Sequence, residues 1–168
     1  HDVLFQMMQY SDIIFGDQNE WEVASGVPHI PFEALDENYV IDREAYLSYF
    51  RKMHRLFSKC KKMVMAVRNQ IASSHHTLSG LLYDTVEDQL YTTRIYDIQP
   101  IVDPMGVGDA FIAAYIHAHQ KWGDENQYCL DFSLSASAIK NTIPGDQNLV
   151  SEEEIISNMT SSGGRIQR

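Results

Sequence analysis

The stretch that decides the fold is Asp103-Pro-Met-Gly-Val-Gly-Asp109, which lies between two apolar runs. Residues 98–102 before it have the composition of a buried strand, and the residues from Ala110 onward have helical spacing. In an open α/β sheet, ligands sit beyond the carboxyl ends of the strands, where such a strand-to-helix turn lies. The first amides of a helix have no partners within the helix, and its dipole favours negative charge there. The turn is therefore a candidate anion site.

Two interpretations of these residues are open. Gly106 and Gly108 remove the side chains that would hold a phosphate away from the backbone, so the amides of Gly106, Val107 and Gly108 are a candidate anion hole. Asp109 would repel a phosphate, but a carboxylate is useful there if it accepts a proton from a hydroxyl that attacks a phosphoryl group. The alternative is an ordinary turn in which Asp109 is a first-turn acid of the helix. No lysine-bearing P-loop occurs in the sequence.

Strands and helices alternate along the rest of the chain. Gly26 is expected to end a short helix, Asp42 to cap a longer one, and Ser151 with Glu154 to open the last one with a capping box. Residues 27–41 read as a loop. Strands are predicted at 11–15, 63–67, 80–83, 89–96 and 98–102, and helices at 19–26, 42–59, 109–122, about 128–141 and from residue 151. The pattern favours an α/β fold, a three-layer αβα sandwich with a mostly parallel sheet and one inserted hairpin.

The composition is that of one globular domain, with 168 residues of which 44% are apolar. A net charge of −10 argues against nucleic acid and against an anionic membrane surface as partners, although a local pocket can still hold a small anion. Cys60 and Cys129 stand alone, which indicates a reducing compartment and predicts a cytoplasmic protein. No apolar stretch approaches the ~18 residues that would span a bilayer. The chain opens with His1 rather than Met, and the sequence leaves open whether residues precede it in the natural protein.

Three segments resemble the ribokinase-like (PfkB) carbohydrate kinases. The turn at 103–109 resembles the family's Asp-Thr-x-Gly-Ala-Gly-Asp signature, and a helix of small residues follows it as in that family. Asn19-Glu-Trp-Glu22, after a strand, resembles the family's Asn-x-x-Glu motif. The end of the chain, at 138–146, 148–151 and 164–168, resembles the C-terminus of 2-keto-3-deoxygluconate kinases. The resemblance covers the whole chain but only the C-terminal portion of a family member.

This resemblance implies a phosphotransferase that uses ATP and Mg²⁺ to phosphorylate a hydroxyl of a sugar acid, 2-keto-3-deoxygluconate in this subgroup. Asp109 would be the base, and the amides of residues 106–108 would hold the γ-phosphate. Asn19 is implied near the phosphates. Glu22 and Asp103 are implied as metal-binding residues, Glu22 through water because magnesium dehydrates reluctantly. A role for Asp103 in capping the turn is an equally open alternative.

The remaining nucleotide contacts are less direct. In the family, the two helices after the signature flank the adenine, which makes Ala138 and Asn141 candidate contacts. Arg68 follows the strand at 63–67, where the family often has Thr-x-Gly, and it could meet a phosphate. The alternative for Arg68 is an exposed ion pair.

Several departures from the family pattern favour a second hypothesis. Pro104 replaces the usual threonine and Val107 the usual alanine. The N-terminal portion that supplies most of the sugar pocket and the lid has no counterpart in the chain, which would leave an unpaired sheet edge that favours association, including a homo-oligomer. The alternative function is therefore a catalytically incompetent nucleotide-binding fragment or an assembly module.

Overall fold

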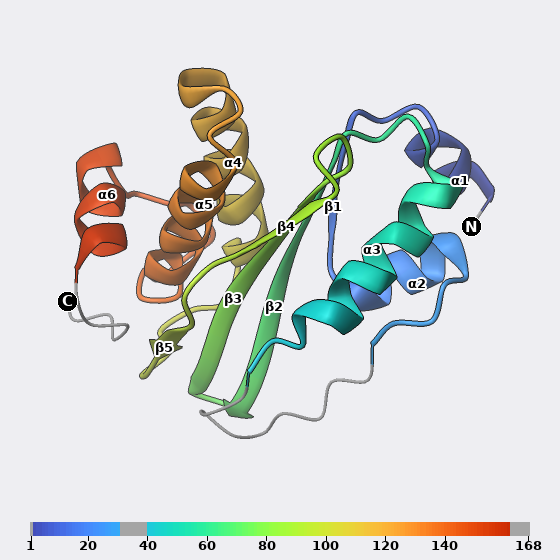
Figure 1. Cartoon of the computed structure of the whole chain (residues 1–168). Coiled ribbons are helices and arrows are strands. Elements are labelled where there is room, and N and C mark those ends of the chain that lie inside the picture. Colours follow the sequence, from blue (N-terminus) through green and yellow to red (C-terminus); the bar gives the residue numbers. More distant parts are fainter. Residues whose placement is uncertain (1, 31–39, 162–168) are drawn as a thin grey trace.

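The computed structural model of the chain describes residues 2–30 and 40–161. These residues form a five-stranded sheet with helices on both faces, which confirms the expected α/β sandwich (Figure 1). Most of the predicted loop at 27–41 and the tail at 162–168 lie outside the described residues. In chain order the elements are α1 (Asp2–Met8), β1 (Ile13–Gly16), α2 (Gln18–Ser25), α3 (Arg43–Leu56), β2 (Lys62–Ala72), β3 (His75–Asp84), β4 (Gln89–Thr92), β5 (Tyr96–Ile98), α4 (Val107–Trp122), α5 (Asn126–Lys140) and α6 (Glu152–Thr160).

The pairing of the strands differs from the expectation in one respect. β1 pairs parallel with β2, but β3 pairs antiparallel with β2, with β4 and with β5. Among the described strands, β3 therefore runs against the other four. Because β3 lies in the interior of the sheet, most neighbouring pairs are antiparallel, and the expectation of mostly parallel pairing is wrong for this part of the fold. The hairpin of β3 and β4 is the predicted one, whereas the longer hairpin of β2 and β3 was not expected.

The sheet separates two apolar cores. Along β2, Val64 faces the core that is shared with α4 and α5, whereas Met63 and Met65 face the core that is shared with α2 and α3. Figure 1 shows α4, α5 and α6 on one side of the sheet and α1, α2 and α3 on the other. The three-layer arrangement is thus confirmed. No helix among the described residues is both long and apolar enough to cross a bilayer.

The strand predicted at 98–102 lies further toward the N-terminus. β5 ends at Ile98, because the chain then leaves the sheet at Pro100, which has no N–H for a ladder hydrogen bond. The Ile101 amide instead donates to the carbonyl of Ser74, 3.0 Å away, in the turn between β2 and β3. β5 runs in the same direction as β1 and β2, so the chain enters α4 from the carboxyl side of these strands.

The helix boundaries follow the predicted caps. Gly26 ends α2 as predicted, in the left-handed conformation with φ 73°, whereas the N-cap of α2, Asp17, was not predicted. Asp42 caps α3, which ends somewhat earlier than predicted. Ser151 and Glu154 form the predicted capping box of α6.

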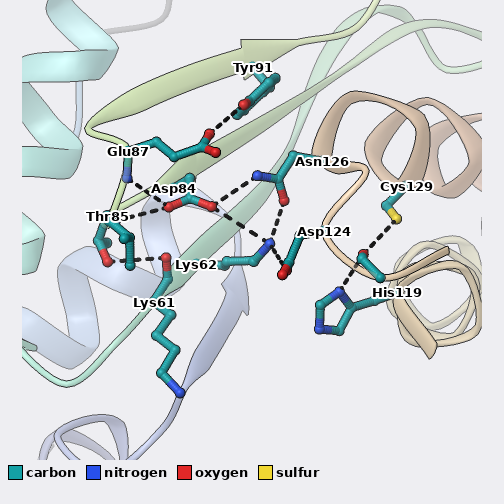
Figure 2. A network of polar contacts seen from close by, with 12 residues as sticks. Lys61, Lys62, Asp84, Thr85, Glu87, Tyr91, His119, Asp124, Asn126 and Cys129 are labelled. Carbon is teal, nitrogen blue, oxygen red and sulfur yellow. Dashed lines mark hydrogen bonds and ion pairs between the residues drawn. The ribbon is translucent and has the colours of Figure 1, made fainter.

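A buried polar network joins the start of β2 to the end of β3, at the end of the sheet away from the turn. Lys62 is 6% exposed, and its Nζ donates to Oδ1 of Asp124 at 2.7 Å and of Asn126 at 2.5 Å. Asp84 lies 3.6 Å from the same nitrogen and accepts from Asn126 at 2.9 Å (Figure 2). Burial alone would raise the pKa of Asp84, but hydrogen bonds from backbone amides and Asn126, with the charge of Lys62, hold it below its ordinary value.

Candidate active site

The turn between β5 and α4 is closed by a contact that glycine permits. Gly106 has φ 73° and ψ 6°, in the left-handed region. A Cβ atom on Gly106 would lie 2.4 Å from the carbonyl oxygen of Asp146 and 2.6 Å from its Oδ1. A larger residue therefore requires the turn and residue 146 to move apart. Gly108, in contrast, has open space where a Cβ would point.

The amides that begin α4 have no acceptor within the described residues. Gly106 is the N-cap of α4 and offers no side chain to them. The first amide to bond back is that of Ala110, which donates to the Gly106 carbonyl at 2.9 Å. The N–H groups of residues 106–109 are thus available to an outside acceptor, at the end of the helix where its dipole favours an anion.

Asp109 lies in the first turn of α4 with its side chain exposed. Among the described residues it has no hydrogen-bond or ion-pair partner, and it lines the cavity beside the turn. A carboxylate locked in a salt bridge or buried in a core would contradict a role as base. Asp109 has the free placement that proton transfer from a bound hydroxyl requires.

A cavity of about 390 Å³ opens beside the turn, between α4, α5, α6 and the segment 146–150. Alanines of α4 and α5, among them Ala113 and Ala136, contribute small apolar side chains to its lining. Further along α4, His117 stacks on Phe132 at a ring distance of 5.8 Å, and both line the cavity. The volume lies within the range of small-molecule sites. Free amides at one place and apolar side chains beyond it suit a ligand that joins an anionic group to an apolar one.

Asp103 serves the turn itself. Its Oδ1 accepts from the Met105 amide at 2.9 Å, and its Oδ2 accepts from the Gly145 amide at 2.8 Å. The bond from Met105, followed by that from Gly145, lowers the pKa of Asp103. Of the two predicted roles, the structure shows the capping one. No group of three or more histidine, cysteine or acidic residues that could hold a metal ion occurs among the described residues.

Asn19 and Glu22 lie on α2, which packs on the other face of the sheet from α4. Asn19 is exposed in the first turn of the helix. Oε2 of Glu22 accepts from the imidazole Nδ1 of His29 and from the His29 amide, which is 3.2 Å away. The imidazole bond is the main cause of the lowered pKa of Glu22. The structure describes no contact between these residues and Asp109.

The other predicted nucleotide contacts lie away from the cavity. Arg68 is an exposed residue of β2, and Ala138 is fully buried in the core beneath α5. Asn141 is buried, and its carbonyl accepts from the amides of Val102 and Asp103 at 2.8 and 3.2 Å. Asn141 therefore holds the start of the turn, and none of the three predicted residues lines the cavity.

The cavity also contains residues for which the sequence predicts no role. Asp146 closes on Gly106, and Ala136 supplies the wall where Ala138 was expected. Asn148 also lines the cavity. The one sequence signal for them is the Pro144-Gly145-Asp146 stretch, which marks a turn but not its partner.

No protein-family model and no curated protein matches the sequence. Solved structures do match. The chain is similar to a 2-dehydro-3-deoxygluconokinase from Thermotoga maritima, with a TM-score of 0.80 and 28% identity over 95% of this chain and 44% of that one. It is also similar to a PfkB family carbohydrate kinase from Listeria grayi, with a TM-score of 0.73 and 25% identity over 93% and 43% of the two chains.

A ribokinase from Arabidopsis thaliana, solved with ribose and ATP, shares the fold with a TM-score of 0.62 and 18% identity over 94% and 44% of the two chains. The chain spans less than half the length of each of these relatives. The resemblance to the ribokinase-like (PfkB) carbohydrate kinases, 2-keto-3-deoxygluconate kinases included, is confirmed for this portion of the fold.

Proposed function

We propose that this chain is the carboxyl-terminal portion of an ATP-dependent sugar kinase, the portion that holds the phosphate donor and supplies the base. The observation that carries the proposal is a free carboxylate, Asp109, at a row of unpaired amides that open on a cavity. The likeness to carbohydrate kinases supports the choice of phosphoryl transfer over other uses of an anion site.

In the proposed reaction, Asp109 accepts the proton of the substrate hydroxyl while the hydroxyl oxygen attacks the γ-phosphorus. The bond from phosphorus to the bridging oxygen breaks, and ADP leaves with that electron pair. The amides of residues 106–108 donate to the oxygens of the transferring group, where the charge of the transition state is spread. Because the amides are already oriented by the helix, they require little rearrangement when the charge develops.

Mg²⁺ would neutralise charge on the β- and γ-phosphate oxygens when bound. Glu22 fits a role through water, since both of its contacts use Oε2 and its Oε1 has no partner among the described residues. Asp103 does not fit as a ligand, because amides occupy both of its oxygens. We propose that Asn19, on the same helix as Glu22, contacts the phosphates.

For the acceptor we propose a sugar acid, with 2-keto-3-deoxygluconate as the first substrate to test. The support is the likeness to the Thermotoga 2-dehydro-3-deoxygluconokinase, which is the most similar in fold of the relatives described above. The groups that read the sugar are proposed to lie in a portion that this chain lacks, since the relatives are more than twice as long. A cytoplasmic location and a homo-oligomer remain predictions from the sequence.

Asp109→Asn tests the proposal, because asparagine keeps the shape of the side chain but cannot accept the proton. In a polypeptide of the relatives' full length, ATP-dependent phosphorylation of the sugar acid should fall by about 10²–10⁴-fold. Binding of AMP-PNP, measured by calorimetry, should change little. The matched control is Glu153→Gln, which removes an exposed first-turn acid from α6 and should leave turnover unaffected. Near-normal turnover of Asp109→Asn would refute the assignment of the base.

The alternative is a nucleotide-binding module without transfer. Two observations support it. Pro104 and Val107 stand where the family signature has threonine and alanine, and the chain spans less than half the length of the kinase. The same two measurements separate the functions. Binding of AMP-PNP without turnover of any sugar acid by the full-length polypeptide would favour the module, and turnover would exclude it.

A further inference from the structure

Lys140 is a buried charge that the proposed reaction does not use. It is the last residue of α5, and its relative exposure is 0%. An ammonium group that is removed from water is costly unless it is paired. Its Nζ donates to the carbonyl of Ile143 at 3.2 Å. One neutral acceptor does not balance the charge, so a carboxylate within range is expected.

The carboxylate whose charge interacts with that of Lys140 is Asp103, at a longer range than a direct ion pair. The charge of Lys140 helps to lower the pKa of Asp103, after the hydrogen bonds from the amides of Met105 and Gly145. The carboxyl end of α5 adds partial negative charge from its last carbonyls. The ammonium is thus stabilised by the charge of Asp103 in the turn and by the Ile143 carbonyl in the loop that follows α5.

The segment 140–146 grips the turn at several points. Asn141 accepts the amides of Val102 and Asp103 at its carbonyl, and Oδ2 of Asp103 accepts the Gly145 amide. The Cα of Gly106 lies so near Asp146 that a Cβ there would overlap the Asp146 carbonyl oxygen. The position of the anion-binding amides is therefore set by a segment that lies beyond α5 in the chain, and Lys140 lies at the beginning of that segment.

We propose that Lys140 is a positioning residue for the anion-binding turn. Its buried ammonium stabilises the Asp103 carboxylate and the Ile143 carbonyl, and through them it fixes the amides of residues 106–108. The identity of the anion rests on the proposed function, whereas the brace between the two segments does not. Donors that are held in place before the ligand arrives stabilise its charge without rearrangement.

A general effect on stability is the competing explanation, and Lys62 is the matched control for it. Lys62 is also a buried lysine beside a carboxylate, Asp84, but it belongs to the network at the opposite end of the sheet from the turn (Figure 2). Lys140→Met and Lys62→Met each remove one buried ammonium and keep most of the side-chain volume. Both should destabilise the fold, since each leaves a carboxylate without its cation.

Two measurements on the folded variants of the full chain test the proposal. Hydrogen exchange of the hydrogen-bonded amides of Val102, Asp103, Met105 and Gly145 should be faster by at least about tenfold in Lys140→Met, relative to the change in global stability, and unaffected on that scale in Lys62→Met. The affinity for MgAMP-PNP, measured by calorimetry, should fall by at least about tenfold in Lys140→Met alone. Methylammonium should restore part of the affinity of Lys140→Ala, and the bulkier tetramethylammonium should not.

Equal behaviour of the two methionine variants in exchange and in binding would overturn the proposal. If the chain with Lys140 intact binds no nucleotide, the proposed function fails, and the exchange measurement still decides whether Lys140 holds the turn. If Lys140→Met does not fold, Asp103→Asn takes its place, because it removes the negative charge that interacts with Lys140. Asp103→Asn should then show fast exchange at the amides of residues 102 and 103, which bond to the Asn141 carbonyl rather than to the altered side chain, and normal exchange would overturn the proposal.

Discussion

Gly106→Ala isolates the contact that closes the turn, and Gly26→Ala is its matched control. Both glycines have φ 73°, but a Cβ on Gly26 meets nothing within 4 Å, whereas on Gly106 it meets the Asp146 carbonyl oxygen at 2.4 Å. A left-handed conformation costs an ordinary residue about 1–2 kcal/mol. Overlap at a packed position adds about 1–3 kcal/mol. We therefore expect the free energy of unfolding to fall by about 1–2 kcal/mol for Gly26→Ala and about 2–5 kcal/mol for Gly106→Ala.

The assay is urea unfolding followed by circular dichroism, with calorimetry of AMP-PNP on the folded variants. Gly26→Ala should bind nucleotide normally, because Gly26 lies at the end of α2 with open space around it. Gly106→Ala should bind more weakly, since the turn must move away from Asp146 to admit the methyl group. An equal loss of stability in the two variants would show that the contact with Asp146 is not closed in solution. Unchanged binding by Gly106→Ala would show that the amides do not hold the phosphate.

Other contacts give outcomes that are simpler to measure. The pKa of Asp103 is lowered below its ordinary value of 3.8, so its carboxylate stabilises the fold above that value, and the contribution is lost as the pH falls through the lower folded pKa. The free energy of unfolding in urea should thus differ between the wild type and Asp103→Asn by a constant amount near neutral pH, and the difference should vanish in strong acid. A difference that grows in acid would show that the pKa of Asp103 is not lowered by folding. Ser151→Ala removes the capping box of α6 and should cost about 1 kcal/mol in urea unfolding. Arg94→Met frees the carbonyls of Asn158 and Ser161 and should speed exchange at the end of α6, with no change at its start.

Local signals predicted the features whose causes are local. Gly26 ends α2, and Ser151 with Glu154 opens α6, because a cap acts on amides and carbonyls within a few residues. The same reasoning placed Asp109 at the mouth of a helix, since a strand, two glycines and a run of helical spacing adjoin in the sequence.

Features that depend on distant partners were not predictable in this way. The second oxygen of Asp103 is held by Gly145, 42 residues further along the chain, so its choice between capping and metal binding is invisible locally. Ala136 and Ala138 are two residues apart on a helix and point in different directions, and the packing of α5 decides which of them reaches the cavity.

The unexpected hairpin has a similar cause. Residues 73–76 are polar, yet His76 is 5% exposed because β3 begins there and this part of it lies between β2 and β5. The extent of β3 follows from the strands that it pairs with rather than from its own composition. Strand pairing is nonlocal, which is why its register was missed while the helix ends were not.

The closure of Gly106 on Asp146 also bears on how the protein is made. A ribosome that has synthesised α4 has already produced the glycines and Asp109, but the residues that lock them in place follow α5. Segments fold from the N-terminus as they emerge. The anion-binding turn is thus expected to reach its final geometry only after the segment that follows α5 has been synthesised.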